Sequence, residues 1–207
     1  MYTLNFKKDL IKIATTFLLV TSFIYFSCNQ KKNYKEPTVK IETNYGDIIV
    51  ELYPEKAPKT VATFLSYVDS GYYKDGSFYR VLKGEDQPSS SFKSDLIQGG
   101  IWQTKNKMLI KLPGIPHETT KQTGILHKDG TISMARLEPG TASSEFFIVI
   151  GDQPAYDYGG DANSDGQGFA AFGRVIEGMD VVKEIHKQPD NETNFTPAIT
   201  ITNIVRL

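Results

Sequence analysis

The sequence predicts a mainly β fold, a closed antiparallel barrel of eight strands capped by two α-helices. Seven or eight short segments of residues 38–207 are apolar, or alternate between apolar and polar residues, as strands do. Only two segments carry apolar residues at helical spacing, and no repeat or low-complexity linker interrupts this part of the chain. Many strands with two helices are typical of a barrel whose ends the helices close.

The domain begins with a predicted β-hairpin and a helix. Residues 39–43 alternate between apolar and polar, residues 44–46 supply a turn, and residues 48–53 form the return strand. Pro54 ends the hairpin, and Pro58 suits the first turn of a helix. One face of that helix is apolar and carries Val61, Phe64, Leu65 and Val68.

The rest of the domain alternates between short strands and long loops. Strands are predicted over residues 78–82, 95–98, 130–135, 146–150, 169–175 and 199–205. A second helix is predicted over residues 178–186, with its apolar residues on one side. The polar loops between strands cover residues 83–94, 111–128 and 151–168. Long loops on a rigid barrel are where a functional site is expected.

Residues 1–27 are predicted to be a lipoprotein-type signal peptide. Three lysines precede an almost wholly apolar stretch over residues 13–26. That stretch is short for a membrane span and suits the apolar region of a secretory signal. At its end, Ser27 precedes the lone cysteine, Cys28, as at a bacterial lipoprotein cleavage site.

On this interpretation Cys28 carries the lipid, residues 28–37 form a polar tether, and residues 38–207 form the folded domain. The alternative is an uncleaved N-terminal anchor with an incidental cysteine. Both interpretations attach the domain to a membrane. We expect it in the bacterial cell envelope, facing the periplasm.

Composition excludes several classes of function. The 207 residues include 23 Lys+Arg and 24 Asp+Glu, and a net charge of −1 lacks the basic excess of a general nucleic-acid binder. A single cysteine rules out an internal disulfide or a cysteine-cluster metal site. The three histidines are scattered along the chain. We therefore expect no metal, no other cofactor and no nucleic-acid partner.

Five short runs carry a recognisable pattern. They are residues 78–81 (FYRV), 97–100 (IQGG), 132–136 (ISMAR), 144–148 (SEFFI) and 172–175 (FGRV). In this order and spacing they resemble the cyclophilins, a family of peptidyl-prolyl cis-trans isomerases. The resemblance covers residues 38–207 and implies an eight-stranded antiparallel barrel with two capping helices, in agreement with the strand pattern.

The implied reaction is rotation about the peptide bond that precedes proline. Amide resonance opposes this rotation with a barrier of ~18–20 kcal/mol. No covalent bond breaks, so the site needs neither nucleophile nor cofactor. It needs an apolar socket for the proline ring and a fixed donor that favours the twisted amide. A guanidinium suits the second task because it stays charged and presents rigid donors.

Carried over by position, the resemblance makes Arg80 the catalytic donor. It makes Gln98 the residue that binds the substrate backbone, and Phe147 the floor of the proline pocket. Taken singly, Arg80 is more commonly a surface arginine. The alternative for Gln98 is a turn residue before two glycines, and core packing is equally plausible for Phe147. Ala135 and Arg136 match the pair that lines the family's peptide groove.

The remaining site candidates lie where the sequence departs from the family's pattern. Asp95 stands where many family members have a pocket phenylalanine, which leaves Leu96 or Ile97 to supply an apolar wall, and Leu96 is taken as the candidate. Tyr156 stands where the family has leucine, and Phe169 stands near the family's pocket histidine. Glu145 replaces a glutamine. Its carboxylate is expected to pair with one of the site arginines, Arg80 or Arg136, which would either orient that arginine or neutralise it.

Three functions are therefore considered. The first is a monomeric isomerase that acts on unfolded or proline-containing exported polypeptides. The second is a catalytically weak binding module or tethered chaperone on the same fold, with Arg80 held by Glu145. The third is a calcium-dependent envelope protein, because residues 161–166 (DANSDG) reproduce the start of a calcium loop. Phe172 stands where that loop needs a glutamate, which favours a simple turn.

Overall fold

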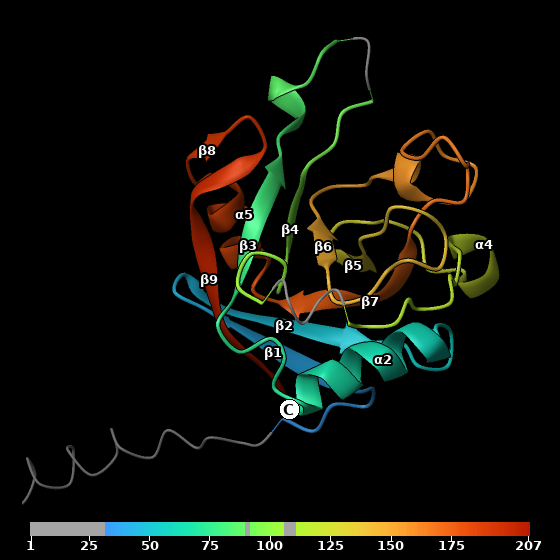
Figure 1. Ribbon diagram of the computed structural model, residues 1–207, viewed down its shortest axis with the longest axis vertical. Helices are drawn as coiled ribbons and strands as arrows, with labels where there is room; N and C mark the ends of the chain where they lie inside the picture. Colours follow the sequence, from blue (N-terminus) through green and yellow to red (C-terminus); the bar gives the residue numbers. More distant parts are fainter. Residues whose placement is uncertain (1–31, 90–91, 106–110) are drawn as a thin grey trace, which may run out of the picture. The chain divides into compact units, whose positions relative to one another are not determined.

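The computed structural model describes residues 32–89, 92–105 and 111–207 (Figure 1). The predicted signal peptide and Cys28 lie outside these residues. Residues 34–207 make up one unit, which holds the barrel and its core. Within the described ranges, no helix is long and apolar enough to cross a membrane.

Eight antiparallel strands close into a barrel, which confirms the predicted architecture. Their order around the wall is β1, β2, β7, β5, β6, β4, β3 and β9, and β9 pairs back with β1 to complete the circle. The bounds of the strands are β1 Thr38–Thr43, β2 Gly46–Leu52, β3 Gly76–Leu82, β4 Leu96–Gly100, β5 Thr131–Met134, β6 Phe146–Val149, β7 Ala170–Glu177 and β9 Asn194–Arg206.

The last strand begins earlier than predicted. A short strand, β8 (Asp190–Asn191), forms a hairpin with β9, which starts at Asn194 rather than at residue 199. The sequence there lacks alternation, and it includes Pro197, which cannot donate to a strand ladder. Glu192 makes the turn with a φ of 61°. The hairpin extends the wall beside Arg80, which pairs with Asn194.

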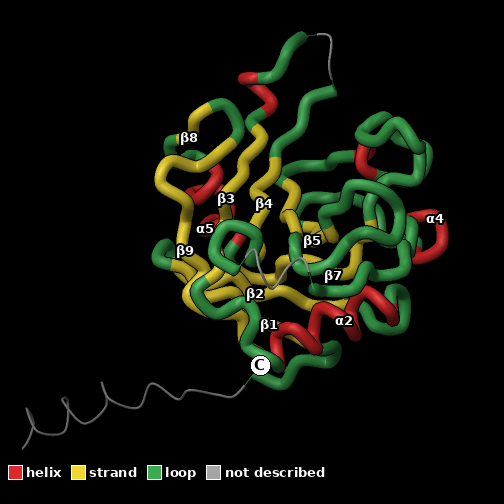
Figure 2. Tube along the Cα trace, viewed as in Figure 1, coloured by secondary structure: helices red, strands yellow, loops and turns green. Residues whose placement is uncertain are grey.

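The two predicted helices are α2 (Pro58–Asp69) and α5 (Met179–His186), and Pro58 occupies the first turn of α2. Figure 1 shows α2 along the lower end of the barrel and α5 behind β3. The described chain also contains short helical turns that the sequence did not predict: α4 (Thr120–Thr123), η1 (Gly84–Asp86) and η2 (Pro154–Tyr156). In Figure 2 long loops lie above β3 and β4 and to the right of β5 and β6.

The barrel interior is filled with aliphatic and aromatic side chains from all eight strands and both helices. Phe64 of α2 stands among Tyr73, Phe146 and Phe172, with ring centroids 5.1–5.9 Å apart. Val182 and Ile185 of α5 belong to the same core. Both helices therefore seal the interior, and any polypeptide must bind on the outside of the wall.

Candidate active site

Strand register brings the first three predicted residues into one row. Arg80 of β3 pairs with Gln98 of β4, and Gln98 pairs with Phe147 of β6. Cross-strand neighbours of this kind have Cβ atoms about 4.5–5.5 Å apart. A bulge between Phe78 and Arg80 adjusts the β3 register just before the arginine. The barrel wall thus presents a guanidinium, an amide and an aromatic ring side by side.

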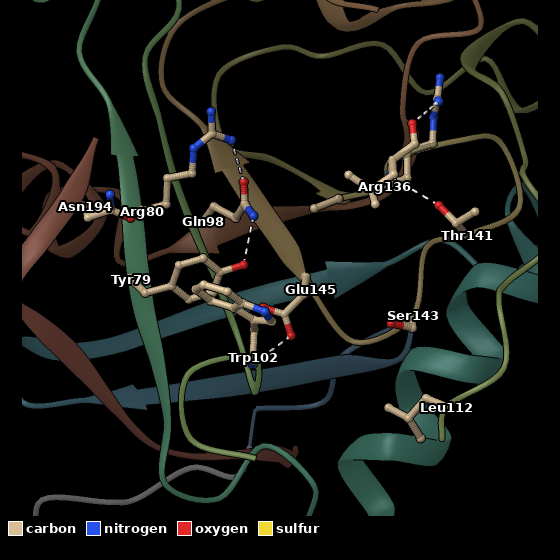
Figure 3. Close-up of a pocket in the computed structure, with 12 residues that line it drawn as sticks. Tyr79, Arg80, Gln98, Trp102, Leu112, Arg136, Thr141, Ser143, Glu145 and Asn194 are labelled. Atoms are coloured by element: carbon tan, nitrogen blue, oxygen red, sulfur yellow. Dashed lines mark hydrogen bonds between the residues drawn. The ribbon is translucent and has the colours of Figure 1, made fainter. Parts of the chain in front are cut away.

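A directional hydrogen-bond chain fixes the arginine (Figure 3). Nη1 of Arg80 donates to Oε1 of Gln98 at 3.1 Å, and Nε2 of Gln98 donates to the Tyr79 hydroxyl at 2.9 Å. A guanidinium is only a donor, so it must face the amide oxygen, which sets the orientation of the amide. Within the described residues, Gln98 is the only hydrogen-bond partner of the Arg80 guanidinium.

An outer aromatic cluster lies next to this row. Leu96, Phe147, Val149 and Tyr156 are buried together on the outer face of the wall, and Leu82, Ala135, Ala162 and Phe169 pack against them. The rings of Phe147, Tyr156 and Phe169 are in mutual contact, with centroids 5.2–5.4 Å apart. Four predicted pocket residues, Leu96, Phe147, Tyr156 and Phe169, are therefore brought together here.

A cavity of ≈570 Å³ adjoins the outer aromatic cluster (Figure 3). The other five predicted site residues line it: Arg80, Gln98, Ala135, Arg136 and Glu145. Ala135 also packs against the outer aromatic cluster, so it joins the two halves of the site. The outer aromatic cluster and the cavity thus share an edge at Ala135.

The expectation that Glu145 pairs with an arginine is wrong. Its Oε1 accepts hydrogen bonds from the backbone amides of Ile101 and Trp102, at 2.9 and 3.1 Å, and from the Ser144 hydroxyl at 3.0 Å. The binding-module hypothesis supposed that Glu145 holds Arg80. Arg80 donates to Gln98 instead, so that premise is not met. Burial raises the pKa of the Glu145 carboxyl, and these amide and hydroxyl hydrogens partly oppose the rise.

Arg136 makes an ion pair with Asp165 instead of Glu145. Its Nη1 and Nη2 donate to the two carboxylate oxygens of Asp165 at 2.7 and 2.9 Å. Hydrogen bonds from Arg136 hold the pKa of Asp165 at about 2. The predicted calcium-loop residue therefore binds a guanidinium. In the part of the chain that the structure describes, no three His, Cys, Asp or Glu side chains are grouped as metal ligands.

Three aromatic residues at the site were not predicted. Tyr79 anchors Gln98, and Trp102 lines the cavity with its ring 5.4 Å from that of Tyr79. Phe92 packs edge-on against Tyr156 at 6.1 Å, on the side where Asp95 replaces the family's phenylalanine. Asp95 itself accepts a hydrogen bond from the Gly84 amide. In the sequence, the only feature that singles out Phe92 is that it is an aromatic residue within a polar loop.

Comparisons with known proteins agree with this geometry. The family model described as cyclophilin type peptidyl-prolyl cis-trans isomerase/CLD matches residues 38–206. The chain is 33% identical over 155 residues to peptidyl-prolyl cis-trans isomerase B of Escherichia coli, covering 71% of this chain and 82% of that protein. It is 36% identical over 152 residues to a peptidyl-prolyl cis-trans isomerase of Acinetobacter baylyi, covering 73% and 72%.

Solved structures are similar as well. A crystal structure of a cyclophilin-type isomerase from Cryptosporidium parvum matches with a TM-score of 0.65 at 26% identity, covering 83% of this chain and 97% of that one. A structure of the same protein in the presence of the dipeptide Ala-Pro matches with a TM-score of 0.64 at 27% identity, covering 81% and 97%.

Proposed function

The chain belongs to the cyclophilin-type peptidyl-prolyl cis-trans isomerase family, and we propose that it isomerises X–Pro bonds where Arg80 meets the outer aromatic cluster. The observation that carries this assignment is the row of Arg80, Gln98 and Phe147 across three neighbouring strands. In this proposal the proline ring lies against Phe147 and its amide nitrogen faces the Arg80 guanidinium.

The chemistry follows from the electronic structure of the amide. As the X–Pro bond twists, resonance is lost and the proline nitrogen regains its lone pair. A guanidinium beside that nitrogen donates a hydrogen bond more strongly to the twisted amide than to either planar form. An interaction that is stronger in the transition state lowers the barrier, which is catalysis by differential binding.

Arg80 is prepared for this task by its neighbours. Its one hydrogen bond to Gln98 fixes the guanidinium and leaves the remaining N–H groups available to a substrate. Gln98 keeps a second N–H on Nε2 that can bind the peptide backbone. Fixing a donor before the substrate arrives removes the cost of orienting it during the reaction.

The test is cis-to-trans relaxation of an X–Pro peptide in the cold, with the full chain and its Arg80→Ala and Arg80→Lys variants. Loss of one aimed donor costs about 10²–10³ in rate at comparable sites, and we expect a loss of that order for Arg80→Ala. Lysine keeps the charge without the planar fork, so Arg80→Lys should recover little. Full activity in well-folded Arg80→Ala would contradict the assignment.

We further propose that the isomerase is exported, lipid-anchored through Cys28, and assists the folding of envelope proteins. The support is the basic start, the apolar residues 13–26 and the Ser27–Cys28 boundary. Labelled fatty acid should enter the wild-type chain and not Cys28→Ser, and only the wild type should sediment with membranes. Equal labelling of both would contradict the anchor.

A further inference from the structure

All donors of Arg136 are used within the protein. A guanidinium has five N–H groups, and this one makes five hydrogen bonds with a side chain that is 0% exposed. Two reach Asp165, two reach the Gly168 carbonyl at 2.6 and 2.9 Å, and one reaches the Leu137 carbonyl at 3.1 Å. Arg136 therefore has no donor left for a substrate, although its residue lines the cavity.

These bonds place Arg136 directly against an aromatic wall of the proposed proline site. Gly168 immediately precedes Phe169, and the guanidinium carbon lies 5.3 Å from the centre of the Phe169 ring. The same ring also contacts Phe147, with ring centroids 5.2 Å apart and planes at 87°. Phe169 is thus in contact with both Arg136 and Phe147.

The same loop is fixed at its other end by a second acidic residue. Asp157 follows Tyr156 and accepts hydrogen bonds from the His127 backbone amide at 3.0 Å and from its ring Nδ1 at 2.7 Å. The amide of Phe169 donates to the Tyr156 carbonyl at 2.9 Å, which closes the base of the loop. Tyr156 and Phe169 are therefore the two stems of one loop over residues 157–168.

Asp165 supplies the charge that makes this arrangement stable. A buried guanidinium without a carboxylate is costly, because its charge has lost water and gained no counter-ion. If Asp165 were neutral, Arg136 would gain by turning toward solvent. That movement would release the Gly168 carbonyl and remove the support behind Phe169.

We propose that Asp165 is a positioning residue of the isomerase, which acts through Arg136 to hold Phe169 against Phe147 in the proline-binding site. The inference rests on the proposed function of the outer aromatic cluster. It predicts an effect on peptide binding, whereas a purely structural loop would affect stability alone.

The test compares two carboxylates of the same loop in the full chain. Asp165→Asn keeps the oxygen that accepts from the Gln167 amide at 2.7 Å and removes the charge that binds Arg136. Asp161→Asn makes the same charge change at an exposed residue and serves as the matched control. Asp165→Glu keeps the negative charge and should therefore recover part of the peptide binding that Asp165→Asn loses.

Two readouts are needed. In X–Pro turnover, Asp165→Asn should raise KM about three- to tenfold and change kcat less than twofold, because the pocket wall is displaced while Arg80 is not. Binding of the same peptide, followed by the fluorescence of Trp102, the sole tryptophan, should weaken by the same factor. Asp161→Asn should match the wild type in both.

Unchanged peptide binding in folded Asp165→Asn would overturn the proposal. An equal loss in Asp161→Asn, or a fall in melting temperature with no change in KM, would also overturn it. A wild-type chain that binds the peptide without accelerating its isomerisation would instead contradict the proposed function, and the Asp165 effect on binding would still be measured.

Discussion

Phe146 and Phe147 are neighbours in β6, and their rings lie on opposite faces of the barrel wall. Phe146 points inward, where Phe64, Tyr73 and Phe78 surround it edge-on at 5.7–5.9 Å. Phe147 points outward into the cluster with Tyr156. Successive side chains of a strand alternate in this way, so one dipeptide contributes both to the core and to the site.

Replacing each phenylalanine should therefore give a different result. Phe146→Ala leaves a cavity in a filled interior, and we expect the free energy of unfolding to fall by about 3–5 kcal/mol. Its KM for an X–Pro peptide should stay at the wild-type value. Phe147→Ala removes the ring beside the proposed proline position and should raise KM tenfold or more. Denaturant unfolding and turnover measure the two effects, and equal KM values would contradict the separation.

Phe92 should contribute to the site although it lies in a polar loop. Its ring contacts Tyr156 and the residue is 40% exposed, so Phe92 lies at the solvent-facing edge of the outer aromatic cluster. We expect Phe92→Ala to raise KM about two- to fivefold, the scale of one aromatic contact. Unfolding free energy should change by less than about 0.5 kcal/mol. Tyr45→Ala, at a comparably exposed ring in the β1–β2 turn, should leave KM unchanged; a similar rise there would contradict a specific role for Phe92.

Strand periodicity was sufficient to predict the barrel, because alternation is set by which face is buried. The strand register seen in the structure then places Gln98 beside Phe147. The hairpin before residue 199 was missed because its residues are polar and include Pro197, so packing rather than pattern fixes it.

Side-chain partners were harder to predict than strands. Glu145 binds two backbone amides, and an amide carries no signal in the sequence. Arg136 binds Asp165, which lies 29 positions away in a loop whose composition indicated a calcium site or a turn. In both cases the choice of partner depends on how a long loop folds back, which the sequence pattern does not encode.

The hydroxyl of Tyr79 should matter for catalysis through Gln98. Tyr79→Phe keeps the ring contact with Trp102 but removes the acceptor for Nε2 of Gln98. The amide is then free to rotate, and Arg80 loses its fixed partner. We expect kcat/KM for X–Pro turnover to fall about tenfold, since small displacements of a catalytic group are costly.

Tyr67→Phe is the matched control for this experiment. The Tyr67 hydroxyl is buried and has no hydrogen-bond partner among the described residues. Tyr67→Phe deletes the same hydroxyl oxygen without breaking a hydrogen bond, so its X–Pro turnover should match that of the wild type. Equal turnover in Tyr79→Phe and the wild type would show that Gln98 does not need this anchor.

The burial of Glu145 should make stability depend on pH. Desolvation raises the pKa of this carboxyl in the folded chain above its ordinary value of 4.5. The folded state therefore binds the proton more tightly than the unfolded state, and stability falls as pH rises from 4.5 through the raised pKa.

Glu145→Gln cannot ionise, so its melting temperature should exceed that of the wild type at pH 7. The difference in melting temperature between Glu145→Gln and the wild type should disappear below pH 4.5. Thermal unfolding across this range, with Glu138→Gln as an exposed carboxylate control, measures the gap. A constant difference at all pH values would mean that the charge of Glu145 is not the cause.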